Sequence, residues 1–441
     1  MAISTMSFLS KAKRPFFLVT ILFLLAAAPA WPAAENEFLT REAREAIVKR
    51  VASEFRAKYF PAQLAEAMAA NLERSFAAGA YDGFGDIPAL AARLQEDLRS
   101  VSRDLHVKVL PGVIPDFDSD AEMLRRENYG FTAVEVLSGN IGYVDFFQFY
   151  AVRDAGATAI AAMNFVANCD ALIVDLRSNG GGYPELRSLI CSYFFDEPKR
   201  LIDFHGRDGV TQNWTLPHVP GRRLPAVPLF VLISRNTFSC AEDFAFCLQG
   251  LGRATVIGEN TRGGAHDAKL WAFPAEGISL QIPFNEAADP RTGKNWEGEG
   301  IKPDVPMPAR KALPAAWRLA AQALLKEEKD QGRRFLLEWI VQDCGAQLES
   351  LQLKPAALRA YAGRYGSSRV VLADSGLLLV LADGSRRRLV PVASDDFKLL
   401  DGERHEYSMT RVYFTRDKRG RLDGMVFHNQ EGRRFPARSR N

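Results

Sequence analysis

The residues best suited to chemistry lie in a polar turn, Ser-Arg-Asn-Thr-Phe-Ser-Cys, at positions 234–240. The apolar run before it, residues 227–233, predicts a buried strand, and a helical pattern begins at Ala241. A serine between a strand and a helix holds its hydroxyl outward, beside the free N–H groups of the first helical turn. Ser239 is therefore the predicted nucleophile. The alternative is that Thr237 or Ser239 only caps the helix.

A second apolar run ends in the turn Asp-Leu-Arg-Ser-Asn-Gly-Gly-Gly, residues 175–182, and a helix is expected after Pro184. Glycines permit unusual dihedrals and close approach of the backbone to a neighbour. A helix that starts here offers further free N–H groups. The motifs GxGxxG and GxxxxGK[ST] are absent, which argues against a dinucleotide or phosphate loop. A plain connection between strand and helix is the alternative.

Taken together, the two turns resemble peptidase family S41, which carries D-L-R-x-N-x-G-G and T-x-S-x-x-E motifs. Here these motifs fall at Asp175–Gly182 and Thr237–Glu242, and residues 258–265 and 298–305 also fit the family. The resemblance covers about residues 40–320. It implies an α/β catalytic domain of the ClpP/crotonase type and a serine peptidase activity.

The resemblance also suggests which base would activate the serine. Tail-specific proteases of the family use a lysine in a T-x-G-K-G context, but Gly264 stands at that position here. A Ser–Lys dyad is therefore not expected, and the tricorn-like branch, with Ser, His and Glu, fits better. In that branch the D-x-H motif matches Asp104-Leu105-His106. A glutamate before the G-[IV]-x-P-D-V motif matches Glu297.

By this resemblance, Ser239 attacks the scissile carbonyl, His106 shuttles the proton and Glu297 orients His106. The backbone N–H groups of Gly181 and Cys240 would form the oxyanion hole. Two alternatives stay open, with His266 as the base or Glu299 in place of Glu297. Where tricorn-type sites have a serine next to the histidine, this chain has Leu105, so a four-residue relay is not expected.

Composition limits the partners and cofactors. The chain has 441 residues, of which 47% are apolar and 25% charged, as in an ordinary globular protein. A formal charge of +3 argues against nucleic acid as the main partner. Five cysteines, an odd number, show no CxxC or Cys/His spacing for zinc. No metal and no cofactor are predicted from these patterns.

The first thirty residues read as a signal peptide. Lys11, Lys13 and Arg14 precede an apolar stretch, and Ala28-Pro29-Ala30 offers a cleavage site. We therefore expect a periplasmic or secreted protein with no stable membrane span after cleavage. An uncleaved anchor is the alternative.

The rest of the chain divides by pattern into four parts. A helical module is expected at 35–100, the catalytic domain at 101–310, a helical linker at 311–345 and an antiparallel β domain at 350–441. Alternating strands and helices in the catalytic domain predict a largely parallel sheet. The β domain, with its Asp/Gly turns, resembles a lipocalin-like domain.

The predicted function is thus an exported serine peptidase that acts on peptide or protein substrates. The alternative is a protein on the same fold that binds an apolar ligand or a peptide with little or no catalysis. Formation of a homo-oligomer is left open. An esterase or β-lactamase is disfavoured, because the mature chain lacks S-x-x-K and the chain lacks G-x-S-x-G.

Overall fold

The computed structural model describes residues 39–115, 120–349, 353–373, 376–400, 410–429 and 438–439. The expected signal peptide at 1–30 lies outside the described residues. None of the described helices combines the length and the apolar character needed to cross a membrane.

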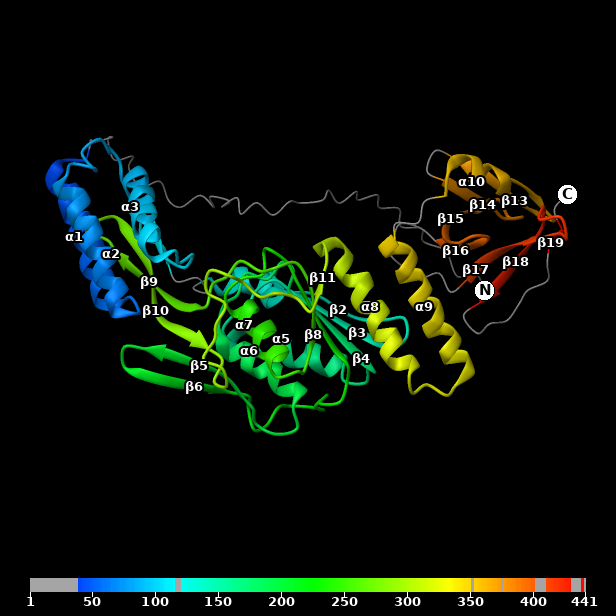
Figure 1. The fold of residues 1–441 in the computed structure, drawn as a ribbon, viewed down its shortest axis with the longest axis horizontal. Helices are drawn as coiled ribbons and strands as arrows, with labels where there is room; N and C mark the ends of the chain where they lie inside the picture. Colours follow the sequence, from blue (N-terminus) through cyan, green and yellow to red (C-terminus); the bar gives the residue numbers. More distant parts are fainter. Residues whose placement is uncertain are drawn as a thin grey trace, which may run out of the picture.

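Three amphipathic helices open the described chain: α1 (Arg41–Lys58), α2 (Ala62–Ala77) and α3 (Ile87–Ser102). Side chains of Thr40 and Asp86 accept hydrogen bonds from the first turns of α1 and α3, which fixes where these helices begin. Their apolar stripes pack against strands β1 and β10 of the following domain in one buried cluster. The helices thus cover one end of a sheet (Figure 1).

That sheet is antiparallel and has five strands in the order β1-β10-β5-β6, with β9 also paired to β10. Its members are β1 (Lys108–Pro111), β5 (Arg200–Gly206), β6 (Gly209–Trp214), β9 (His266–Phe273) and β10 (Ile278–Ala288). We expected β1, β9 and β10 to belong to a largely parallel sheet. Only four residues separate β9 from β10, too few for a parallel crossover, so they pair as a hairpin instead.

The second sheet has the order β11-β8-β7-β4-β3-β2 and is parallel except for the β2–β3 pair. Its strands are β2 (Phe131–Leu137), β3 (Ile141–Phe146), β4 (Ala171–Asp175), β7 (Leu229–Ile233), β8 (Thr255–Gly258) and β11 (Val305–Pro306). Since β4 and β7 are parallel neighbours, the turns that follow them, one glycine-rich and one containing Ser239, meet at the same edge.

Helices cover both faces of this parallel sheet (Figure 1). Leu172 and Val174 of β4 face a core shared with α5, α6 and α7, whereas Ile173 faces α8 and α9. Alternate side chains of a strand point to opposite faces, so a continuous apolar run suits a strand buried on both. The helices within residues 120–349 are α4 (Ala121–Arg126), α5 (Val152–Phe165), α6 (Pro184–Cys191), α7 (Cys240–Gly250), α8 (Ala309–Leu325) and α9 (Gln331–Glu349), with short 3-10 turns at Asn128–Gly130 and Ser192–Phe194.

The C-terminal region is an antiparallel sheet of eight strands paired in sequence order from β12 to β19. Its buried Arg411 forms ion pairs with Asp396 of the same sheet and with Asp343 of α9, and donates to the Trp339 carbonyl oxygen. These contacts attach the sheet to α9. The elements are α10 (Pro355–Tyr361), β12 (Gly363–Tyr365), β13 (Ser368–Ala373), β14 (Gly376–Val380), β15 (Arg386–Ala393), β16 (Asp396–Leu400), β17 (Thr410–Arg416), β18 (Leu422–Asn429) and β19 (Arg438–Ser439).

Candidate active site

The turn that carries Ser239 joins β7 to α7 and is tied to the neighbouring turn by hydrogen bonds. The Thr237 hydroxyl donates to the carbonyl oxygen of Leu176, which follows β4, at 2.7 Å, and the Phe238 N–H donates to the Asn179 carbonyl oxygen at 3.1 Å. Ser239 itself has φ 55° and ψ −126°. A non-glycine residue rarely adopts such a backbone conformation, and strained residues of this kind cluster at functional sites.

Glu242, in the first turn of α7, holds this conformation through hydrogen bonds. Its Oε2 accepts the N–H groups of Ser239 at 2.8 Å and of Gly264 at 3.0 Å. Its Oε1 accepts the Thr261 hydroxyl at 2.6 Å and the Gly263 N–H at 2.7 Å. Because Ser239 and Gly264 share one oxygen, the loop before β9 lies directly beside the Ser239 turn. All four partners are donors, so this carboxylate is held as an acceptor.

The glycine-rich turn packs against Ser239 as closely as its residue types allow. Gly181 has φ 100°, and a Cβ atom at this position would lie 2.7 Å from Ser239 Cβ and 3.0 Å from the Cys240 nitrogen. Both predicted oxyanion donors therefore border Ser239. The Cys240 N–H opens α7, but the Gly181 N–H donates to Asn179 Oδ1 at 2.9 Å. The role of Gly181 as a donor to substrate stays a prediction.

His106 lies against the residue that precedes Ser239. Its ring stacks on Phe238 with centroids 4.5 Å apart, and only 4% of the residue is exposed. Asp104 Oδ1 accepts the His106 backbone N–H at 2.7 Å and lies 3.7 Å from the His106 Nδ1 atom. Both ring nitrogens of His106 are buried and lack a hydrogen-bond partner within the part of the chain that the structure describes.

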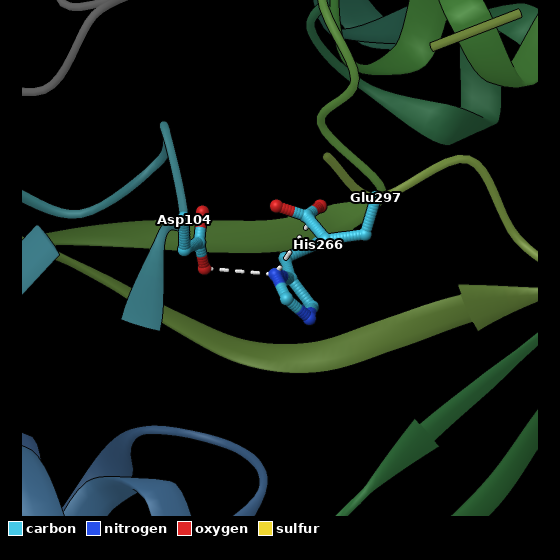
Figure 2. Close-up of side chains that lie close together, drawn as sticks. All are labelled: Asp104, His266 and Glu297. Carbon is cyan, nitrogen blue, oxygen red and sulfur yellow. Dashed lines mark ion pairs between the residues drawn. The ribbon is translucent and has the colours of Figure 1, made fainter. Parts of the chain in front are cut away.

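His266, the alternative base, lies beside Asp104 and Glu297, at the start of β9 (Figure 2). Its Nδ1 atom is 2.8 Å from Asp104 Oδ2 and 3.5 Å from Glu297 Oε2. Glu297 accepts the Ala265 N–H at 2.5 Å, and Asp104 accepts the Tyr59 hydroxyl at 3.1 Å. Three segments far apart in sequence thus bring two carboxylates to one imidazole.

Burial and mutual contact shift the pKa of every member of this group. Burial lowers the pKa of His106. Burial acts against the charged forms of Asp104 and His266 too, but the proximity of His106 and His266 lowers the pKa of Asp104, and that of Asp104 and Glu297 raises the pKa of His266. Burial raises the pKa of Glu297 to about 7, although the His266 charge opposes the change. Clustered shifts of this kind are typical of functional sites.

The arrangement differs from the expected one at Glu297. We expected Glu297 to orient His106, but the histidine that it contacts is His266, and Asp104 stands between the two rings. Glu299, the alternative carboxylate, is exposed. The sequence did not predict a role for Asp104, which was considered only as the first residue of the D-x-H motif. A carboxylate two residues before a candidate base was the signal that could have found it.

The comparisons with known proteins concern the same segment. A profile described as "Peptidase family S41" matches residues 140–307. A carboxyl-terminal-processing protease of Picosynechococcus sp. is 26% identical over 205 residues, which is 46% of each chain. Carboxyl-terminal-processing peptidase 1, chloroplastic, of Arabidopsis thaliana is 25% identical over 40% of this chain and 35% of its own. The chain thus spans less than half the length of these relatives.

Among solved structures, the photosystem II D1 C-terminal processing protease aligns with a TM-score of 0.39 and 15% identity, over 63% of this chain and 94% of that one. The tricorn protease aligns with a TM-score of 0.40 and 14% identity, over 69% of this chain and 37% of that one. The matched segment, residues 140–307, contains the Ser239 turn, the glycine-rich turn and Glu297, so these parts of the candidate site lie in the segment that is similar to peptidase family S41.

Proposed function

We propose that this chain is an exported serine peptidase that hydrolyses peptide bonds through an acyl-enzyme formed on Ser239. One observation carries the proposal: Ser239 is held at φ 55° at the start of α7, directly beside Gly181. This backbone conformation is unfavourable for serine, and a helix cap alone does not require it. A nucleophile whose hydroxyl must project between the two turns accounts for this conformation.

In the proposed mechanism His106 is the general base. It takes the proton of the Ser239 hydroxyl as Oγ bonds to the scissile carbonyl carbon, and it then protonates the departing amine. The unpartnered ring nitrogens and the lowered pKa of His106 support this role, because a base must be neutral and free to accept a proton. The N–H groups of Cys240 and Gly181 would receive the developing oxyanion.

Asp104 and Glu297 would act together on the base. Asp104 lies nearer to His106, and we propose that a small approach from 3.7 Å lets it orient the imidazole once substrate is bound. Catalytic hydrogen bonds are often long before substrate binds. Glu297 would act through His266, which it contacts beside Asp104. The Ser–His–Glu set of the family would then operate here with Asp104 and His266 between the histidine and the glutamate.

Three broader features complete the proposal. The catalytic domain would have the ClpP/crotonase type of fold, and the C-terminal sheet would be lipocalin-like. The division at residues 101–310 and 350–441 would separate these domains, with helices at 35–100 and 311–345 outside them. Export to the periplasm or beyond would follow from the basic and apolar residues at 1–30.

The test is covalent labelling with a fluorophosphonate, followed by mass spectrometry of the labelled peptide. The label is expected on Ser239 and should disappear in Ser239→Ala, whereas Ser178→Ala, a change at an exposed serine in the adjacent turn, should keep it. Cleavage of an unfolded protein substrate should be lost with the label. A folded protein that binds peptides or apolar ligands but never labels would instead favour the binding alternative.

A further inference from the structure

We propose that Asp104, His266 and Glu297 form a binding site for a divalent transition-metal ion, Zn²⁺ in particular (Figure 2). One ligand atom from each residue lies within 4.8 Å of the other two. The three residues are at sequence positions that no metal motif connects, so only the fold brings them together.

The spacing of the ligand atoms suits a small cation. Zinc binds imidazole nitrogen and carboxylate oxygen at about 2.0–2.2 Å, which separates the ligands of a tetrahedral ion by roughly 3.4 Å. His266 Nδ1 lies 3.5 Å from Glu297 Oε2 and 2.8 Å from Asp104 Oδ2. The first pair is already at the required distance, and the second needs to open by about half an ångström.

The donor set selects the class of metal. Imidazole nitrogen favours zinc and its first-row neighbours, whereas Mg²⁺ and Ca²⁺ prefer oxygen ligands alone. Two carboxylates with one neutral imidazole would balance the charge of a divalent ion. Three protein ligands also leave a fourth position for water or for another side chain.

A second observation points to a ligand at the same place. His106 is 4% exposed, its ring nitrogens have no hydrogen-bond partner among the described residues, and Nδ1 lies 3.7 Å from Asp104 Oδ1. Glu297 Oε1 is likewise buried with no partner among those residues. Buried polar atoms are usually satisfied, so unpartnered atoms beside two carboxylates and an imidazole call for an explanation.

The surrounding groups hold the ligands as outer partners do in metal sites. The Tyr59 hydroxyl donates to Asp104, and the Ala265 N–H donates to Glu297. Such donors orient a carboxylate and leave its remaining lone pairs for an ion. Tyr59, which follows α1, and Ala265, which precedes β9, thereby help to hold both carboxylates beside His266.

Metal binding would have a consequence that rests on the proposed function. An ion on Asp104 would compete with the approach of this carboxylate to His106. Zinc would therefore act as a reversible inhibitor of the peptidase, and removal by a chelator would restore activity.

The direct test does not depend on catalysis. Chelator-treated Ser239→Ala protein is titrated with Zn²⁺ by calorimetry, and one ion per chain is expected. Adding His266→Asn or Glu297→Gln should weaken affinity at least about tenfold. His218→Asn, a change at an exposed histidine outside the cluster, should not weaken it. Circular dichroism and thermal melting verify that each variant is folded.

Co²⁺ provides a second measurement, since its visible absorption reports the ligands and their number. The spectrum of bound Co²⁺ should change in His266→Asn and remain in His218→Asn. An absence of one-to-one binding, or an equal loss of affinity in His218→Asn, would overturn the metal site and leave His266 as an imidazole paired with two carboxylates. Failure of Ser239 to label would reject the proposed function without touching this result.

Discussion

Two glutamates border the loop before β9, and they differ in how many hydrogen bonds their carboxyl groups accept. Glu242 accepts four hydrogen bonds, from Thr261, Gly263, Gly264 and Ser239. Glu297 accepts the next N–H of the same loop, from Ala265, and its second oxygen has no partner among the described residues. The loop thus donates hydrogen bonds to two carboxyl groups, one with both oxygens hydrogen-bonded and one with a free oxygen among the described residues.

This difference in hydrogen bonding indicates a structural role for Glu242 and a reactive role for Glu297. Burial raises the pKa of Glu242, the four donors oppose this change, and their hydrogen bonds rigidify the backbone around the carboxyl group. A buried carboxylate with few donors keeps capacity for a proton, a metal or a neighbouring imidazole. The Ser239 turn therefore belongs to the rigid half of the site, and the group around His266 belongs to the half that can change its state.

The two histidines are also expected to differ in role, and replacing them should give the largest effects on activity. His106→Ala should lower kcat/KM by about 10²–10⁴-fold, because the proposed general base is lost. His266→Ala should lower it less, because this residue acts through Asp104. Steady-state cleavage of a fluorogenic peptide measures both. A larger loss in His266→Ala would make His266 the base.

Glu242→Gln tests whether the carboxyl group that accepts four hydrogen bonds stabilises the fold. An amide would set its own N–H groups against donors that now meet a carboxylate, which should cost about 3 kcal/mol of unfolding free energy. Urea denaturation followed by tryptophan fluorescence measures this. Glu299→Gln, at an exposed position in a nearby loop, is the matched control and should change stability little. A cost below about 1 kcal/mol for Glu242→Gln would contradict the supporting role.

Asp145, at the end of β3, extends the comparison to a carboxylate outside the site. Burial raises its pKa to about 6, and the charge of the neighbouring Asp175 adds to the shift. The folded state then binds more protons than the unfolded state, so the unfolding free energy falls as pH rises from about 4 to about 6. Asp145→Asn should remove the contribution of Asp145 to this fall and stabilise the protein at pH 7 by about 1–3 kcal/mol. Denaturation at a series of pH values measures it, and an unchanged pH profile would contradict the shift.

The smallest effect on stability is expected for Glu297→Gln. An amide oxygen can still accept the Ala265 N–H, and the amide avoids the cost of charging a buried carboxyl group whose pKa burial raises to about 7, so the unfolding free energy at pH 7 should not fall. The peptidase rate should nevertheless fall, up to about 10²-fold, if Glu297 helps to place the base. Comparison with Glu242→Gln in the same assays separates the two carboxylates. Equal stability losses in both variants would remove the distinction.

Much of the local structure was predictable because it follows from short-range pattern. Leu229–Ile233 was predicted as a strand and is β7, and the helix expected from Ala241 is α7, which begins at Cys240. Prediction was poorer where a segment is polar or is held by distant contacts. The hairpin of β5 and β6 was missed, since β6 is almost wholly exposed and shows no apolar alternation. The helical segment expected at 311–345 begins earlier, with α8 at Ala309, and Pro314 lies inside this helix.

By itself, the sequence determined the two turns that meet at Ser239, because a strand, a turn and a helix start are encoded within about a dozen neighbouring residues. It also pointed to Ser239, His106, His266 and Glu297 as candidate residues, but not to a role for Asp104. Only the tertiary structure decided which of these residues touch. Asp104, His266 and Glu297 come from three segments whose separation in sequence says nothing of distance, and the fold brings them together where α3 ends, where β9 begins and in the loop before β11. Ion pairs act over a few ångströms, so their choice of partner follows from packing.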